Sequence, residues 1–424
     1  MEILNFLNTV KVFNIDVVKD NVILSGASEL VKNIIEFFSN SLGGYIALGI
    51  IVFTLILKII PLPFDIYSRV ATKKNALKME RMRPELEKLQ RQYANNKELY
   101  SQKMMALYKK EGYSAFATCL PTLITLIFFI IVISAFTQYS TYSKINNFNQ
   151  MAVAYSESVH NNEYVESKVL KVDDNGNVIA NEYDETIVVP EYGSDEYKAI
   201  SYRIVYVTSL SGDVNDDKSE YYIKIVKPAQ DAAADVYLQN TEKQSFLWVK
   251  NIWIEDLPWK KAFLSQDLYA SAFTYSEGCS CDQKSISSSI SSASEYELLM
   301  GSDKLNDLKS APNGYLILVL LSIGSMLLSQ LIMTKSQKAQ LELQTVDQTA
   351  QQSSKMMLWM MPIMFGVFSF MYTASFSLYL IVSTLFSTLS TVVINKIVEK
   401  KFNKEIEKLE EEKYNKRYGY LNKK

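Results

Sequence analysis

The chain has 424 residues, of which 48% are hydrophobic, and its 44 basic side chains nearly balance 46 acidic ones. Its apolar residues are clustered, which favours a membrane protein with several spans over a soluble protein of two or three domains. Three cysteines and one histidine, His160, are too few for a disulfide framework, a zinc site or a histidine-based catalytic triad, so neither a metal nor a cofactor is expected.

Charge is unevenly distributed along the chain. The segment 141–312 carries about twelve more acidic than basic side chains, and the remainder is net basic by about ten. This asymmetry bears on membrane topology, and the near-zero total does not indicate a protein that reads nucleic acid.

Residues 1–42 form an expected extracytoplasmic tail that ends in an amphipathic helix over 22–42. Leu30, Ile34 and Phe37 or Phe38 recur there at helical spacing beside charged residues. Such a helix lies on the outer membrane surface or packs on the helix bundle, and both alternatives stay open. Residues 1–20 lack the basic start and continuous apolar core of a secretory signal.

Five apolar stretches are long enough to be transmembrane helices, at 43–64, 116–138, 314–334, 356–373 and 375–395. The segments after the first and third spans and after the last are basic, which predicts an N-terminus outside and a C-terminus in the cytoplasm. Lys58 is the only charged residue in these spans. A lone cation in hydrocarbon costs about 3 kcal/mol on insertion scales, so we expect Lys58 to face a protein interior or a wet cavity.

Residues 65–115 are predicted to form a cytoplasmic hairpin of two helices joined at Asn95 and Asn96. Met82, Leu86, Leu89 and Tyr93 form the apolar stripe of the first helix, and Tyr100, Met104 and Leu107 form that of the second. A solvated connector and a docking arm for cytoplasmic partners are both compatible with this pattern.

Residues 139–244 are predicted to be an extracytoplasmic β-rich insertion. The stretches SKVLKVDDNGNVIANEYDETIVVP, KAISYRIVYVTSL and EYYIKIVKP alternate apolar and polar residues between turn signals. Residues 245–313 then supply a Trp-rich interface segment and a serine-rich linker, in which Cys279 and Cys281 could form a local disulfide.

A cytoplasmic loop at 335–355 and a basic tail at 396–424 complete the predicted organisation. The tail is expected to be helical. Its charge is compatible with binding to a ribosome, binding to anionic lipid, or simple solvation, and these alternatives stay open.

Several of these motifs together resemble the YidC family of membrane protein insertases. The resemblance rests on FTLILKIIPLPF, on MRPELEKLQRQY with MMALYKKEGYSAFATCLPTLI, on FLWVKNIW, and on MMLWMMPIMFGVFSFMYTASFSLYLIVSTLFS. It implies a five-helix core around a hydrophilic groove that opens to the cytoplasm and to lipid and is closed toward the outside. Lys58 stands where the family usually has an Arg that projects into the groove, so the two-pronged guanidinium is lost here.

The candidate residues follow from the spans and from this resemblance. Hydroxylated and amide residues near Lys58 are predicted to line the groove, and three residues of the hairpin to contact cytoplasmic partners. Serine and threonine in membrane helices more often pack closely or bond their own backbone. The predicted groove set is Lys58, Thr54, Thr122, Thr125, Gln330, Thr384 and Ser387, and the predicted partner contacts are Arg83, Glu85 and Lys88.

The sequence therefore predicts an all-α membrane protein, with a five-transmembrane-helix core, a cytoplasmic α-hairpin and a small inserted extracytoplasmic β-rich domain. The expected function is a non-enzymatic insertase of the bacterial cell membrane that moves transmembrane segments of nascent membrane proteins into the lipid bilayer. A ribosome and a secretion channel are further candidate partners. The alternative is a small-solute transporter or channel with Lys58 as an anion site, although the paired broken helices typical of transporters are not evident.

Overall fold

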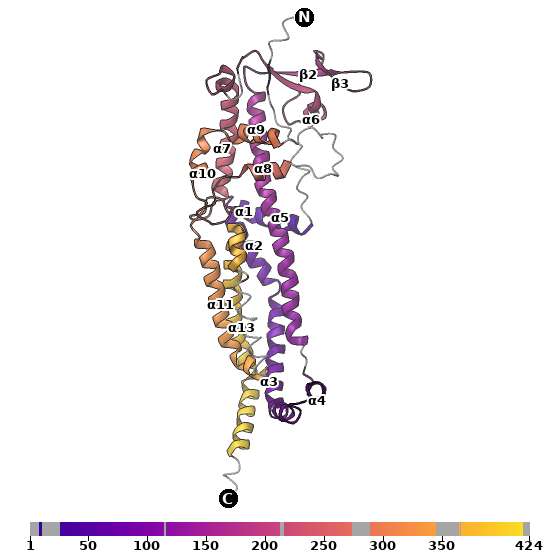
Figure 1. Cartoon of the computed structure of the whole chain (residues 1–424), viewed down its shortest axis with the longest axis vertical. Coiled ribbons are helices and arrows are strands. Elements are labelled where there is room, and N and C mark those ends of the chain that lie inside the picture. Colours follow the sequence, from indigo (N-terminus) through magenta and orange to yellow (C-terminus); the bar gives the residue numbers. More distant parts are fainter. Residues whose placement is uncertain are drawn as a thin grey trace. The chain divides into compact units, whose positions relative to one another are not determined.

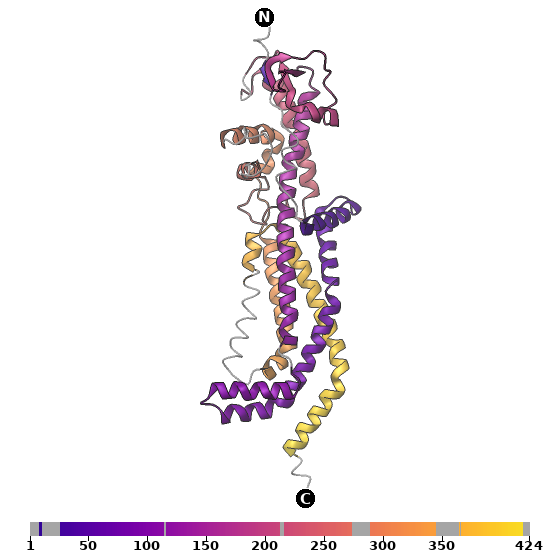
Figure 2. The same ribbon diagram turned by 90° about the vertical axis from the view of Figure 1, so that its right-hand side faces the viewer.

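The computed structural model describes residues 8–10, 26–113, 116–212, 216–273, 289–344, 364 and 366–418. These residues are mostly helical, with one small antiparallel sheet (Figures 1 and 2). The chain divides into two compact units. The helical unit comprises Gly26–Thr137, Ile254–Leu257 and Tyr315–Lys424, and the sheet-bearing unit comprises Met1–Ser25, Gln138–Trp253 and Pro258–Gly314.

The helical unit begins with α1 (Gly26–Ser41), which packs on α2 (Ile46–Ile59). Val31 and Ile35 are buried on one face of α1, whereas Leu30 and Phe37 of the predicted amphipathic stripe are 56% and 65% exposed. The helix therefore packs one face on the bundle and leaves an apolar stripe exposed. The packed face fits a helix that belongs to the bundle, and the exposed stripe fits a helix that lies on the membrane surface.

The helix predicted over 43–64 is shorter in the structure. α2 ends at Ile59, and α3 (Leu62–Gln92) begins after a 43° bend. Pro61 and Pro63 explain the break, because proline has no N–H for the helix ladder and disfavours helical geometry in the residue before it.

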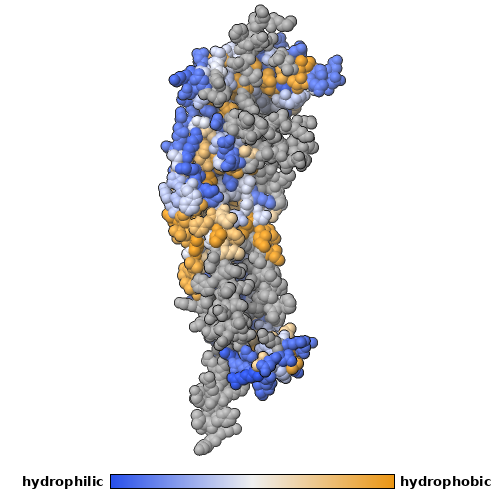
Figure 3. All heavy atoms as spheres, viewed as in Figure 1, coloured by the Kyte–Doolittle hydropathy of each residue, from blue (hydrophilic) through white to orange (hydrophobic). Residues whose placement is uncertain are grey.

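A helical hairpin occurs where the sequence predicts one. α3 and α4 (Lys97–Lys110) bury Met79, Met82, Leu86 and Leu107 between them. Asn96 caps α4, since its side-chain oxygen accepts a hydrogen bond from the Leu99 N–H at 3.0 Å. Partly buried apolar side chains, Leu89, Met104, Tyr108 and Tyr113, pack around this core, and Figure 3 shows a mostly hydrophilic surface at the hairpin.

α5 (Phe116–His160) is much longer than the predicted span at 116–138. The expected β-rich segment 139–244 therefore begins with 22 further residues that are helical as far as His160. No Gly or Pro interrupts residues 122–160, and buried side chains recur at helical spacing in Ile145, Phe148, Ala152, Tyr155 and Val159. The change from apolar to polar composition alters the surroundings of the helix but does not end it.

The remaining helices of this unit are α11 (Ile317–Gln344) and α13 (Ala374–Tyr418), which pack together. Residues 366–371 are also helical, and residues 356–363 and 365 of the predicted span at 356–373 fall outside the described residues. α13 includes most of the basic tail. The part of α11 that is coloured in Figure 3 has a mostly hydrophobic surface. Its exposed large apolar side chains are Leu320, Leu321, Leu327, Leu328 and Leu331.

Within the described ranges, Ala374–Asn403 is the single helical stretch that is long and apolar enough to cross a bilayer by itself. The bent pair Ile46–Ile59 and Leu62–Gln92 passes the same test when the two helices are taken together, and Ile317–Met333 is apolar but shorter. The five-helix core thus stays a prediction.

The sheet-bearing unit contains four antiparallel strands in the order β1-β4-β2-β3. They are β1 (Asn8–Val10), β2 (Glu166–Val172), β3 (Val178–Tyr183) and β4 (Ile204–Thr208). Two of the three predicted strand regions therefore hold strands. The turn between β2 and β3 is organised by Asp173, whose carboxylate accepts N–H bonds from Asn175 and Asn177.

The prediction of a third strand at EYYIKIVKP is wrong. Tyr222–Val226 forms a π-helical turn that continues into α7 (Lys227–Lys243). Four fully buried side chains recur here at helical spacing: Ile225, Ala229, Ala233 and Tyr237. This longer helical stripe determines the local structure, and the short alternation of apolar and polar residues within it does not.

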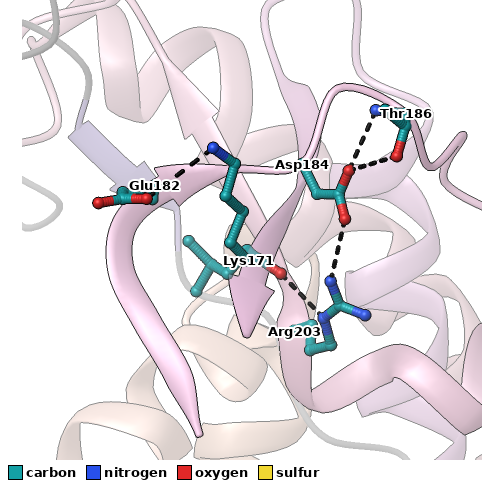
Figure 4. Close-up of polar contacts among 6 residues, drawn as sticks. Lys171, Glu182, Asp184, Thr186 and Arg203 are labelled. Atoms are coloured by element: carbon teal, nitrogen blue, oxygen red, sulfur yellow. Dashed lines mark hydrogen bonds and ion pairs between the residues drawn. The ribbon is translucent and has the colours of Figure 1, made fainter. Parts of the chain in front are cut away.

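Arg203 links the strands of this unit (Figure 4). Its Nε donates to the Leu170 carbonyl at 2.8 Å, and its guanidinium pairs with the Asp184 carboxylate at 3.4 Å. The Asp184 carboxylate also accepts hydrogen bonds from the side chain and backbone of Thr186. These hydrogen bonds, and then the charge of Arg203, hold the pKa of Asp184 below its ordinary value.

The Trp-rich segment predicted to lie at a membrane interface is largely buried in protein. Trp253 is 1% exposed and meets Tyr139 edge-to-face with ring centroids 5.1 Å apart, whereas Trp259 is exposed. Cys279 and Cys281 lie outside the described residues. The remaining helices of this unit are short: α6 (Asp195–Ile200), α8 (Gln266–Phe273), α9 (Ser289–Met300) and α10 (Asn306–Ser310).

Candidate functional site

Lys58 lies in the last turn of α2 on the face of the helix that packs against protein. Ala47, Ile50 and Thr54 precede it at spacings of three and four residues, and each is at most 1% exposed. Residues at this spacing share one helix face. Lys58 itself is half-buried, whereas the next residue, Ile59, is exposed.

Helix packing brings several predicted groove residues onto neighbouring elements. α2 packs against α13, which carries Thr384 and Ser387, and α13 packs against α11, which carries Gln330. All three of these side chains are half-buried. The side chains of Thr122 and Thr125 on α5 lie outside the described residues.

Three threonine hydroxyls on α2 and α13 make local hydrogen bonds. Thr54 Oγ1 donates to the Ile50 carbonyl at 2.7 Å, and Thr388 and Thr391 donate to the carbonyls of Thr384 and Ser387 at the same distance. Each hydroxyl oxygen keeps acceptor capacity after donating its proton. Bonding of this kind to the carbonyl four residues earlier is the common arrangement of threonine within helices.

The structure adds two charged residues that sequence reasoning missed. Asp65 interacts electrostatically with both Lys58 and Arg69. The guanidinium of Arg69 donates to Thr391 Oγ1 at 2.7 Å and to Asn395 Oδ1 at 3.2 Å. The four-residue spacing of Asp65 and Arg69 was the sequence signal for the first pair, but no local signal connects Arg69 to α13.

An apolar contact between the start of the hairpin and α13 follows Arg69 along the chain. Ile394, Val398 and Phe402 form a buried cluster on α13, and Val70 and Leu77 of α3 pack against it. The base of the predicted docking arm is therefore held against α13, which places it next to the helix that bears Thr384 and Ser387.

The residues predicted to contact cytoplasmic partners lie on the outer surface of α3. Arg83, Glu85 and Lys88 are all exposed. Arg83 pairs with Glu87 one turn later at 3.2 Å, with both side chains about half exposed. An exposed pair of this kind contributes little stability, so the surface remains available for other charged groups.

Within the described part of the chain, no group of three or more His, Cys, Asp or Glu side chains could hold a metal ion. His160 is instead surrounded by aromatic rings. Its Nδ1 is 3.3 Å from the Tyr206 hydroxyl, and the rings of Tyr192 and Tyr197 lie nearby. Burial lowers the pKa of His160, which favours its neutral form.

Comparison with known proteins gives a family match over most of the chain. The model of the family described as "60Kd inner membrane protein" matches residues 37–208 and 236–401. No solved structure matches the chain.

Curated relatives match over shorter stretches. A membrane protein insertase YidC of Fusobacterium nucleatum is 33% identical over 98 residues, which cover 22% of this chain and 46% of that protein. A membrane protein insertase YidC of Clostridium perfringens is 38% identical over 81 residues, covering 19% of this chain and 32% of the relative. Membrane protein insertase YidC 2 of Bacillus anthracis is 34% identical over 98 residues, covering 22% and 37%. The matched stretch thus spans less than half the length of each relative.

Proposed function

The chain belongs to the YidC/Oxa1 family of membrane insertases, and from this we propose that it moves transmembrane segments of newly made proteins into the bilayer of a bacterial cell. The main structural observation in support of this proposal is the position of Lys58. It is a charged side chain on the protein-facing side of α2, next to a helix rich in hydroxyl groups.

We propose a core of five transmembrane helices at 43–64, 116–138, 314–334, 356–373 and 375–395, with the N-terminus outside and the C-terminus in the cytoplasm. The basic segments after the first, third and last spans support this direction. The exposed leucines of α11 support a lipid-facing surface on that helix. In this topology the apolar stripe of α1 is available to the outer membrane surface.

The physical task of an insertase is to move polar flanking residues across about 30 Å of hydrocarbon. A hydrophilic groove would let water reach part of the way across the membrane and so shorten this distance. The proposed lining residues are Lys58, Thr54, Thr122, Thr125, Gln330, Thr384 and Ser387. Lys58 would attract acidic flanks, because charge–charge attraction grows where the effective dielectric constant falls. The entering apolar segment would then pass from the groove into lipid.

Partners of this activity are nascent membrane proteins and the lipid bilayer. A ribosome and a secretion channel are proposed further partners, which the exposed charges of Arg83, Glu85 and Lys88 and the basic end of α13 could bind. Coupling of such binding to the groove is supported by the packing of Val70 and Leu77 on α13, since the base of the hairpin contacts the helix that carries groove residues.

Insertion by Lys58 variants tests this function. Host insertase is depleted, the chain is supplied in its place, and protease protection measures insertion of a single-span substrate with an acidic translocated tail. We expect Lys58→Arg to support insertion, and Lys58→Ala or Lys58→Glu to reduce it by about tenfold, as would follow from losing about 1.4 kcal/mol of attraction.

Two controls make the result specific. Lys243→Ala removes an exposed lysine of the sheet-bearing unit and should leave insertion of this substrate unchanged, and a substrate with a neutral tail should be less sensitive to Lys58→Glu. Full insertion of the acidic substrate by Lys58→Glu would refute the electrostatic step. Failure of the unmodified chain, when well expressed and correctly oriented, would refute the insertase function, and labelling of a cysteine at position 58 from both sides of the membrane would indicate a channel instead.

A further inference from the structure

The four-residue segment Ile254–Leu257 belongs to the helical unit, although the residues on either side of it belong to the sheet-bearing unit. The Ile254 carbonyl accepts the N–H of Ala374, the first residue of α13, at 2.9 Å. Asp256 likewise accepts backbone N–H groups at the start of α11, through its carbonyl and its carboxylate. The segment therefore contacts the beginnings of two core helices that are far apart in the chain.

Asp256 is buried, with 1% of its surface exposed, and both of its carboxylate oxygens accept backbone hydrogen bonds. Oδ1 accepts the Tyr315 N–H at 2.8 Å and Oδ2 accepts the Leu318 N–H at 2.6 Å. The Asp256 carbonyl accepts the Leu316 N–H at 3.0 Å. Helix N-termini have unpaired N–H groups and a partial positive charge, so a carboxylate is the acceptor that suits this position best.

The backbone at the same place is held in an uncommon conformation. Leu316 has φ of 68°, in the left-handed region that residues with a branched side chain rarely adopt. This arrangement directs three N–H groups, those of Tyr315, Leu316 and Leu318, toward Asp256. The local geometry is thus built around one residue.

A second polar cluster connects α11, α13 and the helical residues 366–371. The hydroxyl of Ser369 is 2.7 Å from that of Ser322 on α11 and 2.9 Å from that of Ser377 on α13, and all three side chains are fully buried. In hydrocarbon, unpaired polar groups cost several kcal/mol each. Here the three hydroxyls bond one another, so none of them is left unpaired in the interior.

We propose that Asp256 is a positioning residue that closes the outer end of the α11 and α13 pair. It occupies the N–H groups that would otherwise bind water or a polar segment of substrate, and with Ile254 it holds the starts of the two helices together. Water and substrate then reach the core from the cytoplasmic side only. The terms outer and cytoplasmic rest on the topology given under the proposed function.

Side-specific cysteine labelling tests this closure without an insertion assay. Cys119, Cys279 and Cys281 are replaced by serine, and Ser377→Cys, buried and close in size to the original, serves as the reporter. A membrane-impermeant maleimide is added to intact spheroplasts. With Asp256 present we expect little labelling, and with Asp256→Ala we expect the rate to rise about tenfold, the scale of a lost helix cap at the upper end of its range.

Graded and matched variants separate closure from general loss of structure. Asp256→Ser keeps one capping acceptor and should label at an intermediate rate. Ser194→Ala removes the cap of α6 in the other unit, where Ser194 Oγ accepts the Tyr197 N–H at 3.0 Å, and should not change labelling at position 377. If Asp256→Ala does not accumulate, Asp256→Asn and Asp256→Ser carry the comparison with the unmodified residue.

Equal labelling of Ser377→Cys with and without Asp256, or ready labelling from outside while Asp256 is present, would overturn the proposal. Val188, 86% exposed in the sheet-bearing unit, provides a separate check of direction. Val188→Cys should label from outside. If it labels only from the cytoplasm, the proposed topology fails. Closure by Asp256 is then judged by whether Asp256→Ala still raises labelling of position 377 from the side that labels Val188→Cys.

Discussion

At the scale of single residues, Arg69 shows how a charged side chain can connect two elements of the core. It is half-buried and donates to Thr391 and Asn395 on α13. Hydrogen bonds to charged groups contribute more than those between neutral groups. Arg69 therefore helps to hold the start of the hairpin beside the helix that carries the proposed groove residues.

We expect Arg69→Gln and Thr391→Val each to lower the free energy of unfolding of the purified protein by about 1–2 kcal/mol. Because both changes remove the same hydrogen bond, the double variant should lose less than the sum of the two. Denaturant unfolding in mixed micelles measures this cycle. Arg83→Gln is the matched control, since its exposed pair with Glu87 should contribute little, and strictly additive losses for Arg69 and Thr391 would contradict a shared bond.

At the scale of elements, the contact between α1 and α2 depends on a glycine. A Cβ atom at Gly49 would overlap the carbonyl oxygen of Ile35 and crowd the side chain of Ser39. The backbones can approach this closely only because position 49 has no side chain. This close approach buries one face of α1 and leaves its apolar stripe exposed.

Gly49→Ala is therefore expected to destabilise the protein by about 1–3 kcal/mol, because the backbone of α1 must move away. Gly324→Ala is the matched change on α11, where nothing lies within 4 Å of the added Cβ. It should be neutral or stabilising by up to about 1 kcal/mol, through the better helix propensity of alanine. Thermal unfolding of the two variants in detergent distinguishes these outcomes, and equal melting temperatures would show that the close approach is unimportant.

At the scale of the whole molecule, the chain contains two compact units, and we expect them to unfold in separate transitions. Two titratable groups make the sheet-bearing unit sensitive to acid. Burial lowers the pKa of His160, against an opposing effect of Glu157, and hydrogen bonds from Thr186 lower that of Asp184. For both groups the unfolded chain binds more protons than the folded unit, so stability is lost as the pH falls.

The loss linked to His160 should begin below pH of about 6.5, the ordinary pKa of histidine, and that linked to Asp184 below about 4. Calorimetry between pH 7 and pH 5 should show the transition of the sheet-bearing unit moving to lower temperature. His160→Phe keeps an aromatic ring among Tyr192, Tyr197 and Tyr206, and should flatten this dependence. An unchanged slope in His160→Phe would exclude His160 as the cause.

Local pattern predicted much of the architecture. The stripe of Met82 and Leu86 indicated the hairpin, and turn signals around Gly176 indicated the strands β2 and β3, because helices and strands bury side chains at different periods. Local pattern was misleading at Tyr222–Val226, where a short alternation lies within a longer helical stripe. It was also misleading in α5, because the helix continues through the change to polar composition.

The sequence by itself determined that this is a membrane protein of the insertase family, and it singled out Lys58, because composition, hydropathy and short motifs are local properties of the chain. Only the tertiary structure decided which residues hold the core together. Asp256 bonds to Leu318 across 62 positions, and Arg69 to Thr391 across 322. Such pairs depend on how separate helices pack, and side-chain periodicity reports the face that a helix buries but not the partner it buries against.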